Sequence, residues 1–337
     1  MYKYKPKSDV FNEIFTRIYS KLECNIIYVF LCGGDCKESK DHNKKNNHQI
    51  RNKIKQFLEI LSDNKVKVLY PEELFFEKGS KNITKFFKNR DLLELETILA
   101  HNANIVCIIC ESIGSATELG AFTNYREANN NALLDKLVAV TYKKYEKDKP
   151  SFISEGPIKR IVSLDKEKWK LYEYDDDTKK EDYELNQQNL SKELIEKFKK
   201  ICKKNNKNSK NKIFLQPGEP IKNFIGLAYL ILIYIYFYET VTFVDMKLCF
   251  ENKFRQFNIT NLNEFETYYK IAINFLINNQ ELVYKNDNSQ YLLTEKGNDY
   301  IKNILKNLIN INSNELDDIR TRIMYNSMYK KKGNHIS

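Results

Sequence analysis

The chain has 337 residues, which suits about two domains, and its 42% hydrophobic and 30% charged residues are typical of a globular protein, not a disordered one. Its net charge of +10 permits a nucleic-acid partner without requiring one, so the location of the charges is more informative than their sum. The seven cysteines are scattered and Met1–Lys7 is polar, so we expect a cytoplasmic protein without a secretory leader.

The first half of the chain alternates short apolar runs with helical patterns. We expect strands at 25–31, 66–70, 103–110 and 137–142, and helices at 8–24, 48–61, 91–100, 118–129 and 191–202. Continuous apolar runs are typical of parallel strands that are buried on both faces. The alternation therefore predicts an α/β domain with a doubly wound parallel sheet.

The second half is predicted to be mainly helical. Phe224–Tyr238 carries no charge, but as a helix it spans roughly 22 Å, short of the roughly 30 Å membrane core, so a buried helix is favoured over a membrane span. A helix at 263–278, two strands at 281–284 and 291–293, and a closing helix capped by Thr294 outline a winged-helix domain. Such a domain binds either nucleic acid or protein, and the sequence leaves both open.

A lysine-rich segment joins the two halves. Lys197–Lys212 holds eight lysines and no acidic residue, and it is either a solvated helix end running into a flexible linker or a contact for a polyanion. We divide the chain into a first domain at 1–200, a Lys/Asn-rich linker at 201–213 and a C-terminal domain at 214–337.

The cysteine spacings do not favour a metal or redox site. Cys107 and Cys110 have the spacing of a redox pair, but in a strand side chains at i and i+3 point to opposite faces. Cys32 and Cys36 have no second group of His or Cys at zinc spacing. We therefore expect free thiols, no metal and no cofactor.

Three loops follow predicted strands at the edge where open α/β sheets bind ligands. They are Cys32-Gly-Gly-Asp35, Tyr70-Pro-Glu-Glu73 and Glu111–Gly120. Gly33 and Gly34 remove side chains where a ligand could approach the backbone, although any tight turn could use them. Arg51, near the start of the next helix, either reaches a phosphate or lies on the surface.

The third loop carries the most specific pattern. Gly114 and Ser115 are expected to present backbone N–H groups to an anion or a ribose hydroxyl. Glu118 is placed in the first turn of the following helix, where the helix dipole favours its ionised form. Such a carboxylate either stabilises the oxocarbenium-like transition state of glycosidic cleavage or only caps its own helix, and spacing alone leaves both open.

The segment Glu111-Ser-x-Gly-Ser-x-x-Glu-Leu-Gly-Ala-Phe122 resembles the active-site segment of nucleoside 2-deoxyribosyltransferase-like domains and, more narrowly, that of type II retron effectors. Retrons are bacterial anti-phage systems built from a reverse transcriptase, its multicopy single-stranded DNA (msDNA) and an effector. Further segments agree in order: Phe30-Leu-Cys-Gly-Gly-Asp35, Tyr70-Pro-Glu-Glu-Leu-Phe75, Leu95-Glu-x-Ile-Leu-Ala100, Ser151-Phe-Ile-x-x-Gly-Pro157 and a basic tail near Asp317–Lys332.

The resemblance implies a flavodoxin-like first domain and a winged-helix domain that helps to hold a higher-order assembly with reverse transcriptase and msDNA. It implies hydrolysis of NAD⁺, as substrate, to nicotinamide and ADP-ribose. The catalytic glutamate of the family falls on Glu118. The family's binding residues fall on Cys32, Gly33, Gly34, Asp35, Arg51, Glu96, Glu111, Ser112, Gly114 and Ser115. Ile113, where many relatives have Pro, and the insert at Lys40–Asn47 depart from the family and affect the shape of the pocket.

Three functions fit these observations. The favoured one is a toxic, NAD⁺-cleaving effector that reverse transcriptase and msDNA hold inactive until infection. Nicotinamide leaves as a neutral base, so this reaction needs no general acid, in keeping with loops that offer carboxylates and no obvious catalytic histidine. The alternatives are a nucleoside deoxyribosyltransferase or hydrolase, and a non-enzymatic nucleotide sensor that binds DNA.

Overall fold

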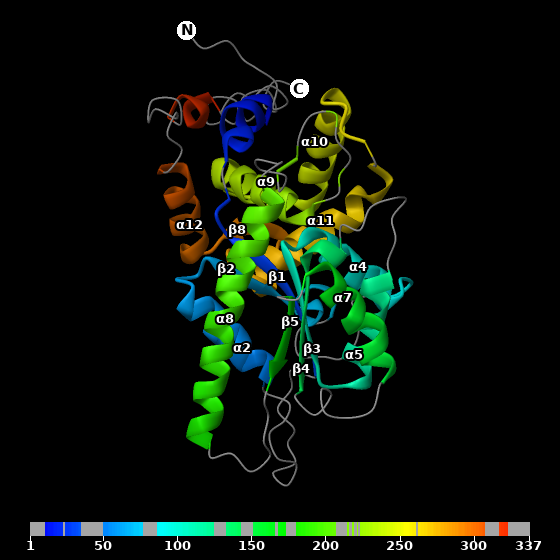
Figure 1. The fold of residues 1–337 in the computed structure, drawn as a ribbon. Coiled ribbons are helices and arrows are strands. Elements are labelled where there is room, and N and C mark those ends of the chain that lie inside the picture. The colour runs from blue at the N-terminus through cyan, green and yellow to red at the C-terminus, as the bar shows by residue number, and fades with distance from the viewer. Residues whose placement is uncertain are drawn as a thin grey trace, which may run out of the picture. The chain divides into compact units, whose positions relative to one another are not determined.

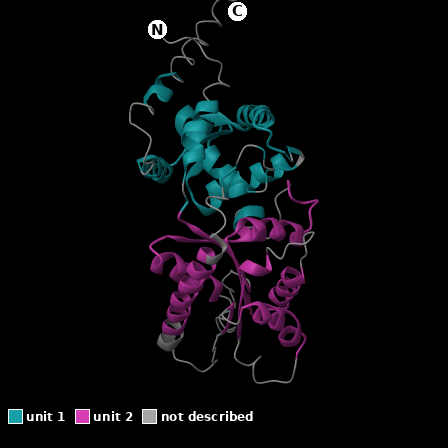
Figure 2. Cartoon of the chain, turned by 45° about the horizontal axis from the view of Figure 1, so that its top comes forward, with its two compact units in different colours: residues 1–24, 73–82, 211–337 teal, residues 25–72, 83–210 magenta. Residues whose placement is uncertain are grey.

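The chain forms two compact units, coloured separately in Figure 2: residues 25–72 with 83–210, and residues 1–24 with 73–82 and 211–337. The computed structural model describes residues 11–22, 24–34, 50–76, 86–124, 133–142, 151–165, 168–172, 180–206, 214, 215, 218, 221, 223–260, 262–306 and 317–322. From the sequence we predicted a single division of the chain, at 201–213. The compact units also separate the N-terminal segment and residues 73–82 from the sheet-containing unit.

The unit of residues 25–72 and 83–210 is built on a five-stranded parallel sheet. Its strands are β1 (Ile27–Cys32), β2 (Val66–Leu69), β3 (Ile105–Cys110), β4 (Leu137–Tyr142) and β5 (Trp169–Tyr172), in the order β2-β1-β3-β4-β5. In the register of the central strands, Val29 lies beside Val68 on one side and Ile105 on the other. This is the flavodoxin-like strand order, so the predicted α/β class is confirmed.

Helices cover both faces of this sheet (Figure 1). α2 (Ile50–Leu61) and α8 (Lys180–Asn206) lie on one face, and α4 (Leu92–Asn102), α5 (Ile113–Asn124) and α7 (Lys159–Leu164) lie on the other. The short elements are η4 (Leu134–Lys136) and the π-helical η5 (Ser154–Ile158), which continues into α7. The short helix α3 (Pro71–Phe75) begins in this unit and ends in the other. Apolar side chains of α2 and α8, among them Ile54 and Leu194, pack on the sheet and form its core there.

Three features of this unit differ from the sequence prediction. Strand β5 was not predicted, because a four-residue edge strand that contains Lys170 lacks the long apolar run of a central strand. α5 begins at Ile113 and not at Glu118, and α8 runs over Lys180–Asn206 and not over 191–202. The early start of α5 moves Glu118 from the first turn of its helix to the second.

The unit of residues 1–24, 73–82 and 211–337 is mainly helical, as predicted. Its elements are η1 (Ile14–Ile18), η2 (Tyr19–Lys21), α9 (Phe224–Tyr238), β6 (Val241–Thr242), α10 (Phe243–Gln256), η7 (Leu262–Glu264), α11 (Phe265–Asn274), η8 (Phe275–Asn279), β7 (Val283–Lys285), β8 (Gln290–Leu293) and α12 (Glu295–Lys306). The three strands form an antiparallel sheet in the order β6-β8-β7. The predicted hairpin and the Thr294 cap, which accepts the N–H of Gly297 at 3.0 Å, are both confirmed.

Helix α9 is the core of this unit. Nearly every residue from Phe224 to Phe237 is buried, which confirms the prediction of a buried helix. Within the part of the chain that the structure describes, no helix is long and apolar enough to cross a membrane.

The N-terminal segment packs into the same unit. The Phe15 and Phe257 rings stack with their centres 4.6 Å apart. The buried Tyr19 hydroxyl donates to the carbonyl oxygen of Gly226 at 2.9 Å and accepts the N–H of Leu215 at 2.9 Å. These contacts join positions about 200 residues apart, so no local sequence pattern could have indicated them.

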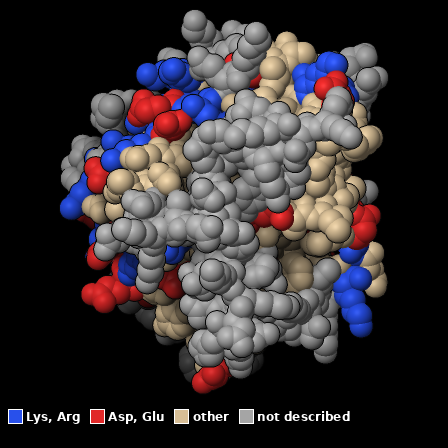
Figure 3. Space-filling view, turned by 60° about the horizontal axis from the view of Figure 1, so that its bottom comes forward, with Lys and Arg blue, Asp and Glu red and all other residues tan. Residues whose placement is uncertain are grey.

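The charged side chains of the described residues show no segregation by sign on the face in Figure 3, where basic and acidic side chains lie interspersed. In α8, Lys197 is only 6% exposed, and Lys199 pairs with Glu196 at 2.7 Å. The lysines of 197–212 therefore do not all face solvent, which weakens the polyanion interpretation for the helical part of that segment.

Candidate active site

The candidate site lies at the carboxyl ends of β1 and β3. β1 leads through α2 to β2 on one side, whereas β3 leads through α5 to β4 on the other. In open α/β sheets this reversal leaves a crevice between the two strands, where ligands bind. Gly33 and Gly34 follow β1 at this point and Glu111 follows β3.

Two serines close the first turn of α5. The Ser112 N–H donates to Ser115 Oγ at 3.0 Å, and the Ser115 N–H donates to Ser112 Oγ at 3.2 Å. The N–H of Glu111 also reaches Ser115 Oγ, at 3.1 Å. From the sequence we expected the Ser115 N–H to bind a ligand, but the hydroxyl of Ser112 accepts that hydrogen bond. Gly114 lies exposed beside this pair of serines.

The Glu118 carboxyl is half-buried in the second turn of α5. Burial raises its pKa to about 7, against the lowering effects of Arg51 and of a hydrogen bond with the Cys32 thiol. Its Oε2 atom is buried and has no hydrogen-bond partner among the described residues. The sequence-based expectation was a carboxyl that ionises more readily, but burial shifts the pKa in the opposite direction, and the helix dipole acts mainly on the first turn.

Glu96, on α4, is a second buried acid at this site. Only 6% of the residue is exposed, and burial raises its pKa to about 8, with further increases from the charges of Glu118 and Glu72. Near neutral pH, Glu96 therefore holds its proton while Glu118 is close to its midpoint. The two carboxyls together carry well under two negative charges.

Arg51, from the first turn of α2, supplies the positive charge of the cluster. The residue is 4% exposed, and its guanidinium forms an ion pair with Glu72 at 2.5 Å. The guanidinium also lies 4.6 Å from the centre of the Tyr70 ring, and the Tyr70 hydroxyl donates to the Arg51 carbonyl oxygen at 3.0 Å. Sequence reasoning placed the loop of Tyr70 and Glu72 at this edge but did not identify either residue as a member of the site.

The two glycines after β1 make room for the protein's own side chains. A Cβ atom on Gly33 would lie 3.3 Å from Arg51 Cδ, and one on Gly34 would lie 2.9 Å from Glu111 Oε2. Arg51 and Glu111 thus occupy the space that the sequence analysis reserved for a ligand. The glycines position the site by allowing this close approach.

These contacts connect nearly all of the predicted residues. The members that lie together at this edge are Cys32, Gly33, Gly34, Arg51, Glu96, Glu111, Ser112, Gly114, Ser115 and Glu118. The remaining predicted residue, Asp35, lies outside the described residues, as do Cys36 and the insert at 40–47.

The thiols near the site are free and protonated. Burial raises the pKa values of Cys107 and Cys110 to about 12, and that of Cys32 well above the usual range of a thiol. A protonated Cys32 thiol can donate to Glu118. Among the described residues, no three His, Cys, Asp or Glu side chains are grouped so that they could hold a metal ion.

Comparison with known proteins gives two kinds of match. The family profile described as "STM3845 retron effector protein" matches residues 47–285. The "Retron Ec86 putative ribosyltransferase/DNA-binding protein" of Escherichia coli is 38% identical over 136 residues, and its Ec73 counterpart is 34% identical over 137. These alignments cover 40% of this chain but only 37% and 38% of the relatives' own lengths.

Proposed function

The chain belongs to the STM3845 retron effector protein family, and from this premise we propose that it cleaves the N-glycosidic bond of NAD⁺, releasing nicotinamide and ADP-ribose as the toxic step of anti-phage defence. The observation that carries the proposal is a half-buried carboxyl, Glu118, at the crevice of a flavodoxin-like sheet. The description of two relatives as ribosyltransferases supports glycosyl chemistry. A nucleoside 2-deoxyribosyltransferase-like first domain is part of this proposal.

The charge state of the cluster suits a cationic substrate. A pyridinium ribosyl group bound beside Glu118 favours the ionised carboxylate, which then stabilises or traps the positive charge that develops at the anomeric carbon. Glu96 keeps its proton and so limits the negative charge that the buried site must hold before the substrate binds. Nicotinamide leaves as a neutral base, so the site needs no proton donor for the leaving group.

The test of the catalytic role is Glu118→Gln in the full chain. The amide preserves shape but cannot become anionic, so NAD⁺ loss should fall at least ~10²-fold, the range expected when a charge-stabilising group is removed. The matched control is Glu193→Gln, which removes an α8 carboxylate that pairs with Lys170 at 2.7 Å. NAD⁺ is quantified in cells and with purified protein. Undiminished NAD⁺ loss in Glu118→Gln would refute the mechanism.

We also propose that the mainly helical unit is a winged helix that contacts reverse transcriptase and msDNA. Its order of helix, strand, two helices, hairpin and helix supports the first part, and the description of the relatives as DNA-binding supports the second. In a winged helix that reads DNA, the helix before the hairpin enters the major groove. Here α11 is largely buried, whereas Tyr284 and Lys285 of the hairpin are exposed, which favours contact through the hairpin. NAD⁺ quantitation with and without reverse transcriptase and msDNA tests whether these partners inhibit the protein.

Nucleoside transfer is the second candidate, favoured by the ribosyltransferase description of the relatives. Under this alternative the purified protein turns over deoxyinosine or thymidine and leaves NAD⁺ intact. A non-enzymatic sensor, the third reading, binds nucleotide without turnover, and its DNA affinity survives Glu118→Gln.

A further inference from the structure

Two large apolar side chains of the sheet-containing unit are almost fully exposed. Ile113 is 88% exposed and Phe152 is 86% exposed, the highest values among the large hydrophobic residues that the structure describes. Single exposed apolar residues are ordinary on protein surfaces. This pair is unusual because both members occupy the same position in the same local structure.

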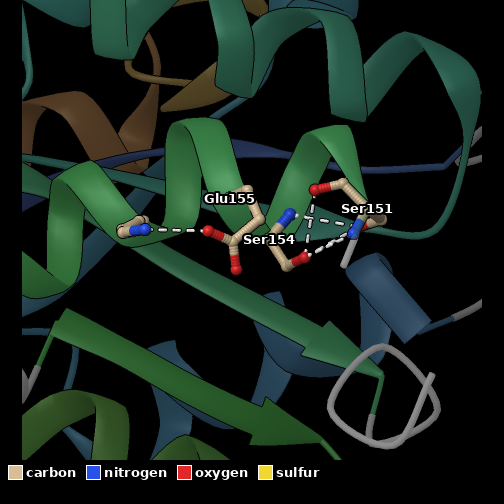
Figure 4. A network of polar contacts seen from close by, with 4 residues as sticks. Ser151, Ser154 and Glu155 are labelled. Carbon is tan, nitrogen blue, oxygen red and sulfur yellow. Dashed lines mark hydrogen bonds and ion pairs between the residues drawn. The ribbon is translucent and has the colours of Figure 1, made fainter. Parts of the chain in front are cut away.

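Each side chain follows the first serine of a Ser-x-x-Ser pair that opens a helix. In the second pair, the Ser151 N–H donates to Ser154 Oγ at 2.9 Å and the Ser154 N–H donates to Ser151 Oγ at 3.1 Å (Figure 4). These bonds reproduce the arrangement of Ser112 and Ser115 around Ile113. The reciprocal caps hold the first turn closed, so each apolar side chain stays in solvent at the tip of its helix.

The two helix tips lie at the same edge of the sheet. α5 follows β3 and the η5–α7 helix follows the adjacent parallel strand β4, so both helices run away from the carboxyl edge. Arg160 Nη1, from the middle of the η5–α7 helix, donates at 2.7 Å to Oδ1 of Asn124, the last residue of α5. α5 also packs directly against η5. The first turns of both helices therefore lie at the carboxyl edge of adjacent strands, which places Ile113 and Phe152 at the edge that carries the candidate site.

We propose that Ile113 and Phe152 form a subsite that receives a planar heteroaromatic ring of the nucleotide substrate. The inference rests on the proposed function. It names the side chains that contact a ring of the substrate, a contact that the polar residues of the site do not provide. A Phe side chain offers a flat face for stacking, and Ile113 offers an aliphatic contact from the neighbouring helix. Among the described residues, nothing covers either side chain.

The test compares Phe152→Ala, Ile113→Ala, Phe152→Trp and Leu164→Ala in the full chain. Loss of a stacked ring costs about 1–3 kcal/mol, so KM for NAD⁺ should rise about 5- to 160-fold in Phe152→Ala, with kcat little changed. Ile113→Ala should show a smaller rise, and Phe152→Trp should retain wild-type affinity. Leu164→Ala truncates an exposed apolar residue near the other end of the same helix and should change nothing.

Calorimetric titrations with ADP-ribose and with nicotinamide identify the ring. Weaker ADP-ribose binding in Phe152→Ala assigns the adenine, and weaker nicotinamide binding assigns the leaving base. The subsite is overturned if the Ile113/Phe152 double alanine variant binds NAD⁺, ADP-ribose and nicotinamide with unchanged affinity. The same conclusion holds if that variant loses binding to reverse transcriptase or msDNA instead. Because binding is measured directly, this result stands apart from failure of the proposed reaction, which appears as intact NAD⁺ with wild-type protein.

Discussion

Glu96 and Glu118 belong to one partly dehydrated cluster with Arg51 and Glu72. Burial is the largest cause of both raised pKa values, and the mutual repulsion of the carboxyls adds to the shift of Glu96. Arg51 offsets only part of this effect, because its guanidinium also pairs with Glu72. In the folded protein these two carboxyls therefore lose their protons at a higher pH than exposed acids do.

The raised pKa of Glu96 predicts that the stability of the protein depends on pH. In the unfolded chain Glu96 ionises near pH 4.5, whereas in the folded protein it holds its proton to about 8. Between these values the unfolded state binds fewer protons, so stability falls as pH rises through this window. Glu96→Gln removes the ionisation, so its melting temperature should decline less than that of wild type between about pH 5 and about pH 9.

The control for this prediction is Glu94→Gln on the same helix. Glu94 is exposed and pairs with Arg90, so its removal should leave the wild-type pH profile intact. Thermal melts across the pH range provide the measurement. Parallel profiles for wild type and Glu96→Gln would show that Glu96 ionises normally in the folded protein.

The junction between the β7–β8 hairpin and α12 depends on one glycine. Thr294 donates its hydroxyl to the carbonyl oxygen of Glu281 at 2.8 Å and caps α12 through the N–H of Gly297. A Cβ atom on Gly297 would overlap the backbone carbonyl of Leu282. Backbone cannot rotate away as the end of a flexible side chain can, so this close approach requires glycine.

Gly297→Ala should therefore destabilise the protein by about 1–3 kcal/mol or more, because the hairpin and the helix must separate. Gly120→Ala is the matched comparison, since a Cβ atom there meets nothing within 4 Å and lies inside α5. Its expected effect is a stabilisation of about 0.5–1 kcal/mol, from the higher helix propensity of alanine. Urea denaturation measures both, and equal effects of the two substitutions would contradict the predicted overlap.

At the scale of the whole molecule, the chain order and the compact units do not coincide. The N-terminal segment, with Phe15 and Tyr19, lies in the core of the unit that residues 211–337 largely form. A fragment that starts after residue 210 would therefore lack part of its own core. The two units are linked covalently at several points of the chain rather than at one.

Cleavage at a protease site inserted in residues 207–213 tests this organisation. The two fragments should stay associated in gel filtration, because Tyr19 remains hydrogen-bonded to Gly226 and Leu215. Phe15→Asp places a charge in a site that is 1% exposed and should weaken the association strongly. Separation of the cleaved fragments without that substitution would contradict the packing of the N-terminal segment.

The sequence by itself determined most of the secondary structure and indicated the edge of the sheet at which the candidate site lies. Buried parallel strands are continuous apolar runs, so β1 to β4 and the loop after β3 could be recognised locally. The hairpin and the Thr294 cap were equally local. Strand β5 was not recognised because it is short and lies at the edge of the sheet. The true start of α5 was not recognised because Ile113 and Gly114, which follow the capping serine, do not extend the apolar period of the helix.

Only the tertiary structure decided the chemistry of the cluster. Whether Glu118 is ionised depends on burial and on Glu72, Arg51 and Cys32, which arrive from other elements. Likewise, Gly33 and Gly34 could not reveal that Arg51 and Glu111 fill the space beside them. Helical and strand patterns depend on the contacts of a residue with its neighbours along the chain. The pKa of a buried carboxyl and the space beside a glycine depend on residues that are distant in the sequence.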